Sequence, residues 1–368
     1  MPDSALFLLS AAASLWASWL LVSRLERLGN RLGFTEAMLG LVAALAADAP
    51  EITSAIGAMA GHHQEVGAGV VVGSNVFNLA ALLGLGAVAA GWVALHRRVV
   101  VLTGAISLWI AAACVLTVLG AVTPLAGLLL VLAVMVPYAL LAARRHERPA
   151  RTRAGRWLVR AVREEEIELH PALVLESSRF DVPVALAALA VVVAASLVME
   201  HSATTLGRRY AVPDIVVGGI VLAAVTSLPN AVAAIYLARK GRGTAMLSTA
   251  LNSNALNILV GLLVPAVIVG LGATTGREVL VAAWYGGLTA VVLVLAYRDR
   301  GLRRAAGVLV LVAYGIFVVV LDAAAHGDES LLVLLGPLAV IGPWTLLLLL
   351  PRAATVPAGP EAASEAAS

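Results

Sequence analysis

Apolar runs long enough to cross a bilayer recur along almost the whole chain and constrain its fold more than any other feature. A spanning helix needs about 20 apolar residues. Since 61% of the 368 residues are hydrophobic and only 13% are charged, the composition excludes an ordinary soluble domain. We expect an all-α polytopic membrane protein. Eleven candidate spans lie at residues 5–23, 35–60, 66–91, 99–119, 122–143, 182–200, 213–238, 243–270, 278–297, 303–322 and 331–350.

Arginine and lysine residues are distributed unevenly between the predicted loops. With the N-terminus outside, 22 of them lie on the cytoplasmic side and 3 on the other, which is the bias of a correctly oriented membrane protein. This orientation places Arg148 in the cytoplasm and His326 outside. The single cysteine, Cys114, lies in an apolar run, so no disulfide can form within the chain.

Two parts of the sequence resemble each other at a constant offset of 179 residues. VAALAADAPEITSAI aligns with VLAAVTSLPNAVAAI, and VVGSNVFNLAALLG aligns with ALNSNALNILVGLL. Because five predicted spans separate the copies, the second must run through the membrane in the opposite direction, as in secondary transporters built from inverted repeats. The informative matches are Gly40 with Gly219, Pro50 with Pro229, Ser74 with Ser253, Asn75 with Asn254, and Asn78 with Asn257.

The repeat predicts two inverted-topology five-helix units with an extra C-terminal transmembrane helix. The first unit is 1–144 and the second is 181–322, joined by a cytoplasmic linker at 145–180. The linker has an amphipathic, arginine-rich pattern that favours a helix lying at the lipid interface. Residues 323–368 hold the eleventh span and a tail whose composition favours disorder.

Two carboxylates, Asp48 and Glu51, interrupt the second apolar run. An acid at the centre of a spanning helix costs about 2.5 to 3.5 kcal/mol, so it is kept where it faces a cavity, a partner or an ion. The i, i+3 spacing predicts that both lie on one helix face. Pro50 leaves the carbonyl of Ala46 without its helical donor, and we expect that carbonyl to line a cavity or meet a cation.

The next helix of each repeat adds serine and asparagine side chains. With the two acids they form a set of oxygen ligands without sulfur or imidazole, which suits hard cations such as Ca²⁺ or Na⁺. The alternatives are a structural pair of acids and asparagines that only hold helices together. The added residues are Ser74, Asn75 and Asn78 in one repeat and Asn252, Ser253, Asn254 and Asn257 in the other.

GSNVFN preceded by APE, and TSLPN followed by NSNALN, resemble the two alpha-repeats of the sodium/calcium exchangers in the cation/calcium antiporter superfamily. The chain resembles a divergent prokaryotic-type member. The resemblance implies ten spans in two inverted repeats that bind calcium and sodium alternately. It also implies ligand positions at Glu51, Ser74, Asn78, Thr226, Ser227, Ser253 and Asn257.

The chain departs from the family pattern at the acids. Ala46, Ala47 and Asp48 stand where the family typically has Gly-Thr-Ser, and Asn230 replaces the glutamate of the second repeat. Both carboxylates of the predicted site therefore come from the first repeat. The full predicted set is Ala47, Asp48, Glu51, Ser74, Asn75, Asn78, Thr226, Ser227, Asn230, Ser253, Asn254 and Asn257.

We predict a secondary active antiporter that exchanges Ca²⁺ for Na⁺ by alternating access. Alternatives are a proton-coupled exchanger (Ca²⁺/H⁺ or Na⁺/H⁺), an ion channel, or a non-transporting degenerate homologue. An enzyme is not expected, because no nucleophile, base and orienting group converge in the sequence. The expected partners are the lipid bilayer and small inorganic cations, without nucleic acid or a permanent cofactor; the oligomeric state is left open.

Two further expectations complete the prediction. The resemblance to prokaryotic-type members places the chain in the plasma (inner) membrane of a prokaryote. The sequence GHHQE, which contains His62, His63 and Glu65, allows a metal site, but a solvated turn outside the membrane is favoured.

Overall fold

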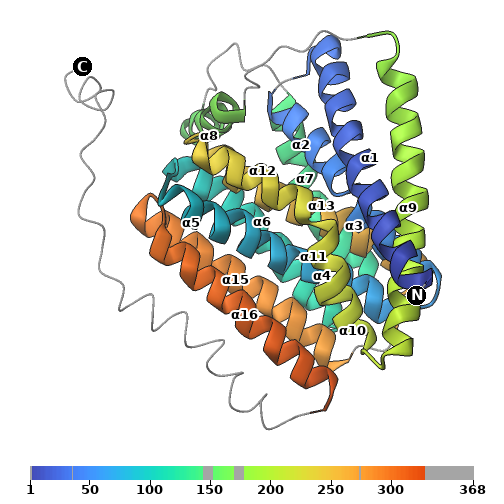
Figure 1. Cartoon of the computed structure of the whole chain (residues 1–368). Coiled ribbons are helices and arrows are strands. Elements are labelled where there is room, and N and C mark those ends of the chain that lie inside the picture. The colour runs from blue at the N-terminus through green and yellow to red at the C-terminus, as the bar shows by residue number, and fades with distance from the viewer. Residues whose placement is uncertain (1, 35, 144–151, 170–177, 273–274, 328–368) are drawn as a thin grey trace.

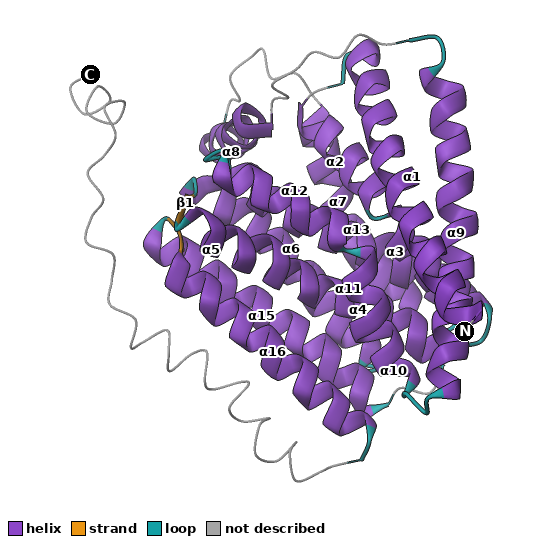
Figure 2. Ribbon diagram, viewed as in Figure 1, coloured by secondary structure: helices purple, strands orange, loops and turns teal. Residues whose placement is uncertain are grey.

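The computed structural model describes residues 2–34, 36–143, 152–169, 178–272 and 275–327. Within these ranges the chain is helical apart from a two-stranded antiparallel ribbon, β1 (Trp92–Ala94) and β2 (Gly301–Arg303) (Figure 2). The predicted eleventh span at 331–350 and the tail lie outside the described residues.

The helices of the first half are α1 (Pro2–Leu32), α2 (Glu36–Ala47), α3 (Ala49–Ala60), α4 (Gln64–Asn78), the π-helix η1 (Leu79–Leu85), α5 (Gly86–Ala90), α6 (Arg97–Val118) and α7 (Pro124–Ala143). The linker forms α8 (Arg153–Leu169). The helices of the second half are α9 (Asp181–Arg209), α10 (Asp214–Val216), the π-helix η2 (Val217–Leu222), α11 (Ala223–Thr226), α12 (Leu228–Arg239), α13 (Gly243–Leu256), the π-helix η3 (Asn257–Leu263), α14 (Val264–Val269), α15 (Gly276–Asp299) and α16 (Arg304–Ala325).

Among the described residues, eight helices are long and apolar enough to cross a membrane. Two bent pairs, 41–60 and 214–239, raise this number to ten when each pair is taken as one span. These ten coincide with the first ten predicted runs. The bends, 54° and 47°, occur just before Pro50 and Pro229, because proline cannot continue a helical hydrogen-bond ladder but is tolerated in the first turn of a new helix.

The offset of 179 residues reappears in the positions of the helices. It separates the first residues of α1 and α9, of α3 and α12, and of α6 and α15. Contacts along α1 and α9 pair the start of one helix with the end of the other, so the two run antiparallel, side by side (Figure 1). The contacts are Asp3 with Arg209 at 4.0 Å, Ser14 Oγ with Ser196 Oγ at 2.7 Å, and Arg24 Nη1 with Asp181 Oδ1 at 3.0 Å.

Close backbone packing joins the two halves where α4 crosses η2. A Cβ atom on Gly73 would lie 2.3 Å from the carbonyl oxygen of Gly219. One on Gly218 would lie 2.3 Å from the carbonyl oxygen of Val66. Since the obstructing atoms are backbone and not flexible side chains, these positions admit only glycine without a shift of the helices.

We therefore expect Gly73→Ala to destabilise the protein by about 1 to 3 kcal/mol, the usual cost of overpacking, although alanine is the better helix former. Thermal unfolding of the purified protein in detergent measures the effect. The matched control is Gly315→Ala in α16, where an added Cβ would meet nothing within 4 Å. Equal melting temperatures for the two variants would contradict the expectation.

Candidate cation-binding site

The break between α2 and α3 positions the two carboxylates of the predicted site. Asp48 is the residue between the helices, and Glu51 lies in the first turn of α3. The helix is not continuous here, because the chain bends between Ala47 and Ala49, but Asp48 is the N-cap of α3 and its carbonyl oxygen accepts a hydrogen bond from the amide of Ile52 at 2.9 Å. Both side chains are fully buried.

Each carboxylate is held by polar side chains from the second half of the chain. Oδ1 of Asp48 accepts hydrogen bonds from Asn230 Nδ2 at 2.8 Å and from Ser253 Oγ at 2.7 Å. The two oxygens of Glu51 accept from Ser227 Oγ and Asn257 Nδ2. The first half thus supplies the acids and the second half supplies the donors, so the site exists only between the halves.

The asparagines of α4, α13 and η3 form a reciprocal network beside these acids. Asn75 Nδ2 donates to the carbonyl oxygen of Asn254 at 3.0 Å, and Asn254 Nδ2 donates to that of Asn75 at 3.1 Å. Asn78 Nδ2 donates to Asn254 Oδ1 at 3.2 Å, and Asn257 Nδ2 to Asn75 Oδ1 at 3.3 Å. Because Asn75 and Asn254, like Asn78 and Asn257, are separated by the repeat offset, these bonds are related by a local two-fold axis.

Four buried side-chain oxygens at the site have no hydrogen-bond partner among the described residues. They are Asp48 Oδ2, Ser74 Oγ, Asn78 Oδ1 and Asn257 Oδ1. A buried polar atom without a partner costs about 1 to 3 kcal/mol. A hard cation bound by these oxygens would remove that cost, since Ca²⁺ and Na⁺ bind through oxygen.

The negative charge of this site comes from few groups. No group of three or more histidine, cysteine, aspartate or glutamate side chains gathers anywhere in the described part of the chain. The predicted site therefore has two carboxylates surrounded by neutral amide and hydroxyl oxygens. A cation bound there would be a substrate and not a permanent cofactor.

Two predicted ligand positions have other partners in the structure. The hydroxyl of Thr226 donates to the carbonyl oxygen of Leu222, one turn earlier, at 2.9 Å. The carbonyl oxygens of Ala46 and Ala47 accept from Ser18 Oγ at 3.0 and 3.3 Å. The carbonyl oxygen freed by Pro50 thus accepts a hydrogen bond from a serine of α1. Ser18 carries no signal in the sequence that would have placed it at this site.

The GHHQE turn does not gather metal ligands. His63 contacts Arg208 Nη2 at 3.1 Å and lies 4.0 Å from Asp214, while His62 is exposed. Neither histidine belongs to a cluster of three ligating groups in the described residues. The solvated turn remains the better interpretation of this segment.

Glu200 is a buried carboxylate that sequence analysis did not single out. It lies within the apolar helix α9, is 7% exposed, and accepts a hydrogen bond from Thr204 Oγ1 at 3.0 Å. Asp48 and Glu51 are therefore not the only acids inside a candidate span. Its polar partner on the same helix satisfies one of its oxygens.

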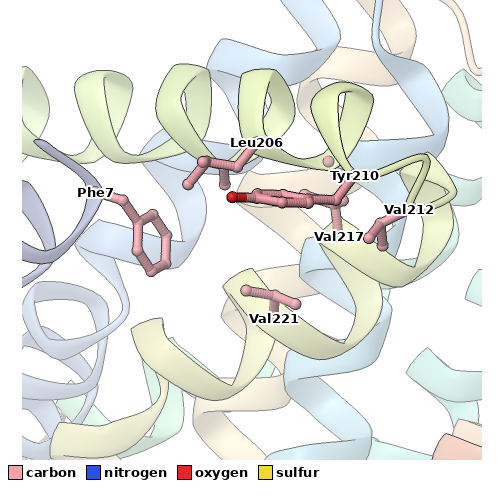
Figure 3. A pocket seen from close by; sticks show the side chains of 8 residues that line it. Phe7, Leu206, Tyr210, Val212, Val217 and Val221 are labelled. Carbon is pink, nitrogen blue, oxygen red and sulfur yellow. The ribbon is translucent and has the colours of Figure 1, made fainter. Parts of the chain in front are cut away.

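An apolar cavity of about 140 Å³ lies apart from the acids, between α1, α9 and η2. Figure 3 shows Phe7 on one side of it and Tyr210 and Val212 on the other, with Val221 below. None of its lining residues belongs to the predicted site, and its apolar wall suits hydrocarbon and not a cation.

Sequence comparison finds one protein family in both halves of the chain. The model of the family described as "Sodium/calcium exchanger protein" matches residues 4–143 and again 182–321. Sodium/potassium/calcium exchanger 4 of Homo sapiens is 35% identical over 132 residues, which are 33% of this chain and 21% of that protein. Sodium/potassium/calcium exchanger 3 of Rattus norvegicus is 36% identical over 74 residues, or 20% and 12% of the two chains. The matched segments thus span about a fifth or less of the curated relatives.

Two solved structures share the fold over nearly their whole length. The crystal structure of the H⁺/Ca²⁺ exchanger CAX superposes with a TM-score of 0.67 at 14% identity, covering 94% of this chain and 91% of that one. The sodium-calcium exchanger NCX_Mj superposes with a TM-score of 0.58 at 18% identity, covering 87% and 98%. At these identities the likeness establishes the fold.

Proposed function

Because this chain belongs to the sodium/calcium exchanger protein family and is a multi-pass membrane protein, we propose that it exchanges Ca²⁺ for Na⁺ across the membrane as a secondary active antiporter. The observation that carries the proposal is the set of four unpartnered, buried oxygens on residues of the predicted site, one of which is Oδ2 of Asp48. These atoms, with the carboxylate of Glu51, offer the oxygen ligands that a dehydrated Ca²⁺ or Na⁺ ion requires.

The position of the site between two related halves supports alternating access. We propose residues 1–144 and 181–322 as the two units, with 145–180 as the linker between them. The site lies where Asp48 and Glu51 of one unit meet the donors of the other. A change in the relative position of the units would then expose the same ligands first to one side of the membrane and then to the other.

Proton coupling is the second candidate. The fold superposes on an H⁺/Ca²⁺ exchanger as well as on a sodium-calcium exchanger. The two carboxylates can neutralise one Ca²⁺, two Na⁺ or two protons, so the charge of the site favours neither counter-ion. In either case the chain's own residues have the same tasks: the acids bind the ion or proton, and the asparagines and serines orient the acids.

The test is uptake of labelled calcium by proteoliposomes under an imposed sodium gradient and, separately, under an imposed proton gradient. Antiport requires the counter-ion on the far side, and uptake should rise only with the gradient that the protein uses. Calcium flux that is equal with and without any counter-ion would indicate a channel. No flux under any gradient would indicate a degenerate homologue.

The proposed orientation has the N-terminus outside, in the plasma (inner) membrane of a prokaryote. On a Cys114→Ala background, His326→Cys should react with an impermeant thiol reagent in intact cells, because His326 is exposed at the end of α16. Lys240→Cys, in the exposed turn after α12, should react only after the cells are opened. Lys240 is the cytoplasmic labelling position, because Arg148, which is also predicted to be cytoplasmic, lies outside the described residues. The reverse labelling pattern would invert the topology.

A further inference from the structure

We propose that the apolar segment 331–350, the predicted eleventh span, packs antiparallel to α16 and fills a groove between α16 and η2. The segment itself lies outside the described residues, but the surface of α16 and the point where the described chain ends, Gly327, are both defined. Figure 1 shows α16 at the edge of the bundle, on the side away from α1 and α9. The contact is an interface within the chain, and it does not depend on which ions the protein exchanges.

The outward face of α16 is a narrow stripe. Successive exposed residues after the first turn are separated by four and three positions alternately, so they fall within about 80° of the helix circumference. This is the spacing of a seam at which one helix packs along another. In α9, by contrast, neighbouring residues are exposed together at 186–187, 193–194 and 197–198, and a wider face meets the lipid. The stripe of α16 consists of Val308, Val312, Gly315, Val319, Asp322 and His326.

A groove of about 510 Å³ lies beside the last turns of this stripe. Val216 and Ile220 of the α10–η2 segment form one wall, and Val318 and Val319 of α16 form the other. The side chain of Asp322 is at the end nearer the C-terminus of α16. Because the walls are apolar, the groove suits the side chains of another helix or a lipid chain, and not a hydrated cation.

The length of the connection decides between these occupants. Only residues 328–330 separate Gly327 from the segment. The four links from 327 to 331 reach at most about 14 Å, and packed helices lie about 8 to 10 Å apart. A span that starts at 331 must therefore be a direct neighbour of α16. The inner side of α16 already packs against η1, α5 and α15, so the free positions are the stripe and the groove.

The antiparallel arrangement fixes which residues face one another. Positions equally far from the connection are opposite: Val319 is eight residues before 327 and Ala339 is eight after 331, while Val312 and Leu346 are each fifteen away. A Cβ atom added to Gly315 would meet nothing within 4 Å in the described part of the chain. Small residues such as these let two membrane helices approach closely.

The proposed interface also touches the second broken span. The α10–η2 segment continues through α11 to Ser227, whose hydroxyl donates to Glu51. A helix seated in the groove would thus contact the same span that supplies a donor to the predicted cation site, at residues Val216 and Ile220.

The test is disulfide formation in membranes, in the full chain on a Cys114→Ala background. Under mild oxidation, Val319→Cys should form a disulfide with Ala339→Cys, since two cysteines are bridged only when their Cα atoms lie within about 7 Å. After denaturation, a gel with a maleimide-linked polymer counts the free thiols. Val319→Cys with Leu346→Cys is the matched control, because seven residues displace the partner by about 10 Å along the helix, and both thiols should remain free.

A cysteine scan of positions 336–342 against Val319→Cys covers a shift in register, and size-exclusion profiles establish that each variant folds. Two results would overturn the proposal. No disulfide anywhere in the scan, together with labelling of Val319→Cys by a membrane-soluble maleimide as fast as that of Leu129→Cys on the exposed face of α7, would mean that lipid covers the stripe. A disulfide-linked dimer of the single variant Val319→Cys would mean that a second copy covers it. Since the measurement needs no transport, failure of the proposed exchange function would leave its outcome unchanged.

Discussion

Replacing Glu51 by glutamine is expected to abolish cation exchange while leaving the protein folded. The two oxygens of Glu51 accept bonds from Ser227 and Asn257, and the side chain is fully buried between the halves. A carboxylate beside a cation in such a site contributes several kcal/mol, so its loss should lower the exchange rate by at least about a hundredfold. Asp48→Asn should weaken exchange as well, because Asp48 Oδ2 is one of the unpartnered oxygens.

The measurement is calcium uptake by proteoliposomes, with size-exclusion profiles and melting temperatures to establish that each variant folds. The control is Glu65→Gln, which neutralises a partly exposed acid in the first turn of α4. Glu65→Gln should exchange normally. Normal exchange by the double variant Asp48→Asn, Glu51→Gln would mean that the cations bind elsewhere.

Introducing an acid at Asn230 is expected to make exchange depend on membrane voltage. In the wild type Asn230 is neutral and donates to Asp48 at 2.8 Å, so the proposed site holds two negative charges. One Ca²⁺ or two monovalent ions balance these charges, and the cycle should move little net charge. Asn230→Glu adds a third negative charge beside Asp48, and an extra cation must accompany it to offset the repulsion.

The measurement is exchange in proteoliposomes held at different potentials with a potassium ionophore. Each elementary charge moved across the membrane is worth about 2.3 kcal/mol per 100 mV, so a change of one charge per cycle is readily detected. Asn230→Gln is the matched control, because it keeps an amide at this position. A wild-type rate that depends steeply on voltage would contradict the charge count and would require a further negative group in the cycle.

Much of the helical architecture was predictable from local signals. The apolar runs gave the helices, and Pro50 and Pro229 indicated where the second and seventh spans break. The family match in both halves agrees with the internal offset of the sequence. Asn78 is linked to Asp48 through Ser253, and Asn75 is linked to Glu51 through Asn257. Ser74 is buried on the same helix, and its hydroxyl has no partner among the described residues.

The remaining parts depend on contacts between distant segments, which periodicity cannot supply. Ser18 donates to the carbonyls at the break from 28 residues away, and only the packing of α1 brings it there. Glu165 of the linker helix is buried, and its Oε1 accepts a hydrogen bond from the hydroxyl of Tyr138, 27 residues earlier in the chain. The position of Asp48 at the start of α3, and not inside one continuous helix, follows from the bend, whose angle no pattern of residues specifies.

The paired amide bonds between Asn75 and Asn254 have a mechanical consequence for the site. They join α4 to α13 at equivalent points, with one bond on each side of the local axis. A movement that treats both halves alike changes the two bonds equally, whereas a sliding of one helix along the other must break both together. The asparagine pair therefore fixes the register of α4 against α13. It permits rocking of the two halves about the centre of the molecule and resists the sliding of one half along the other.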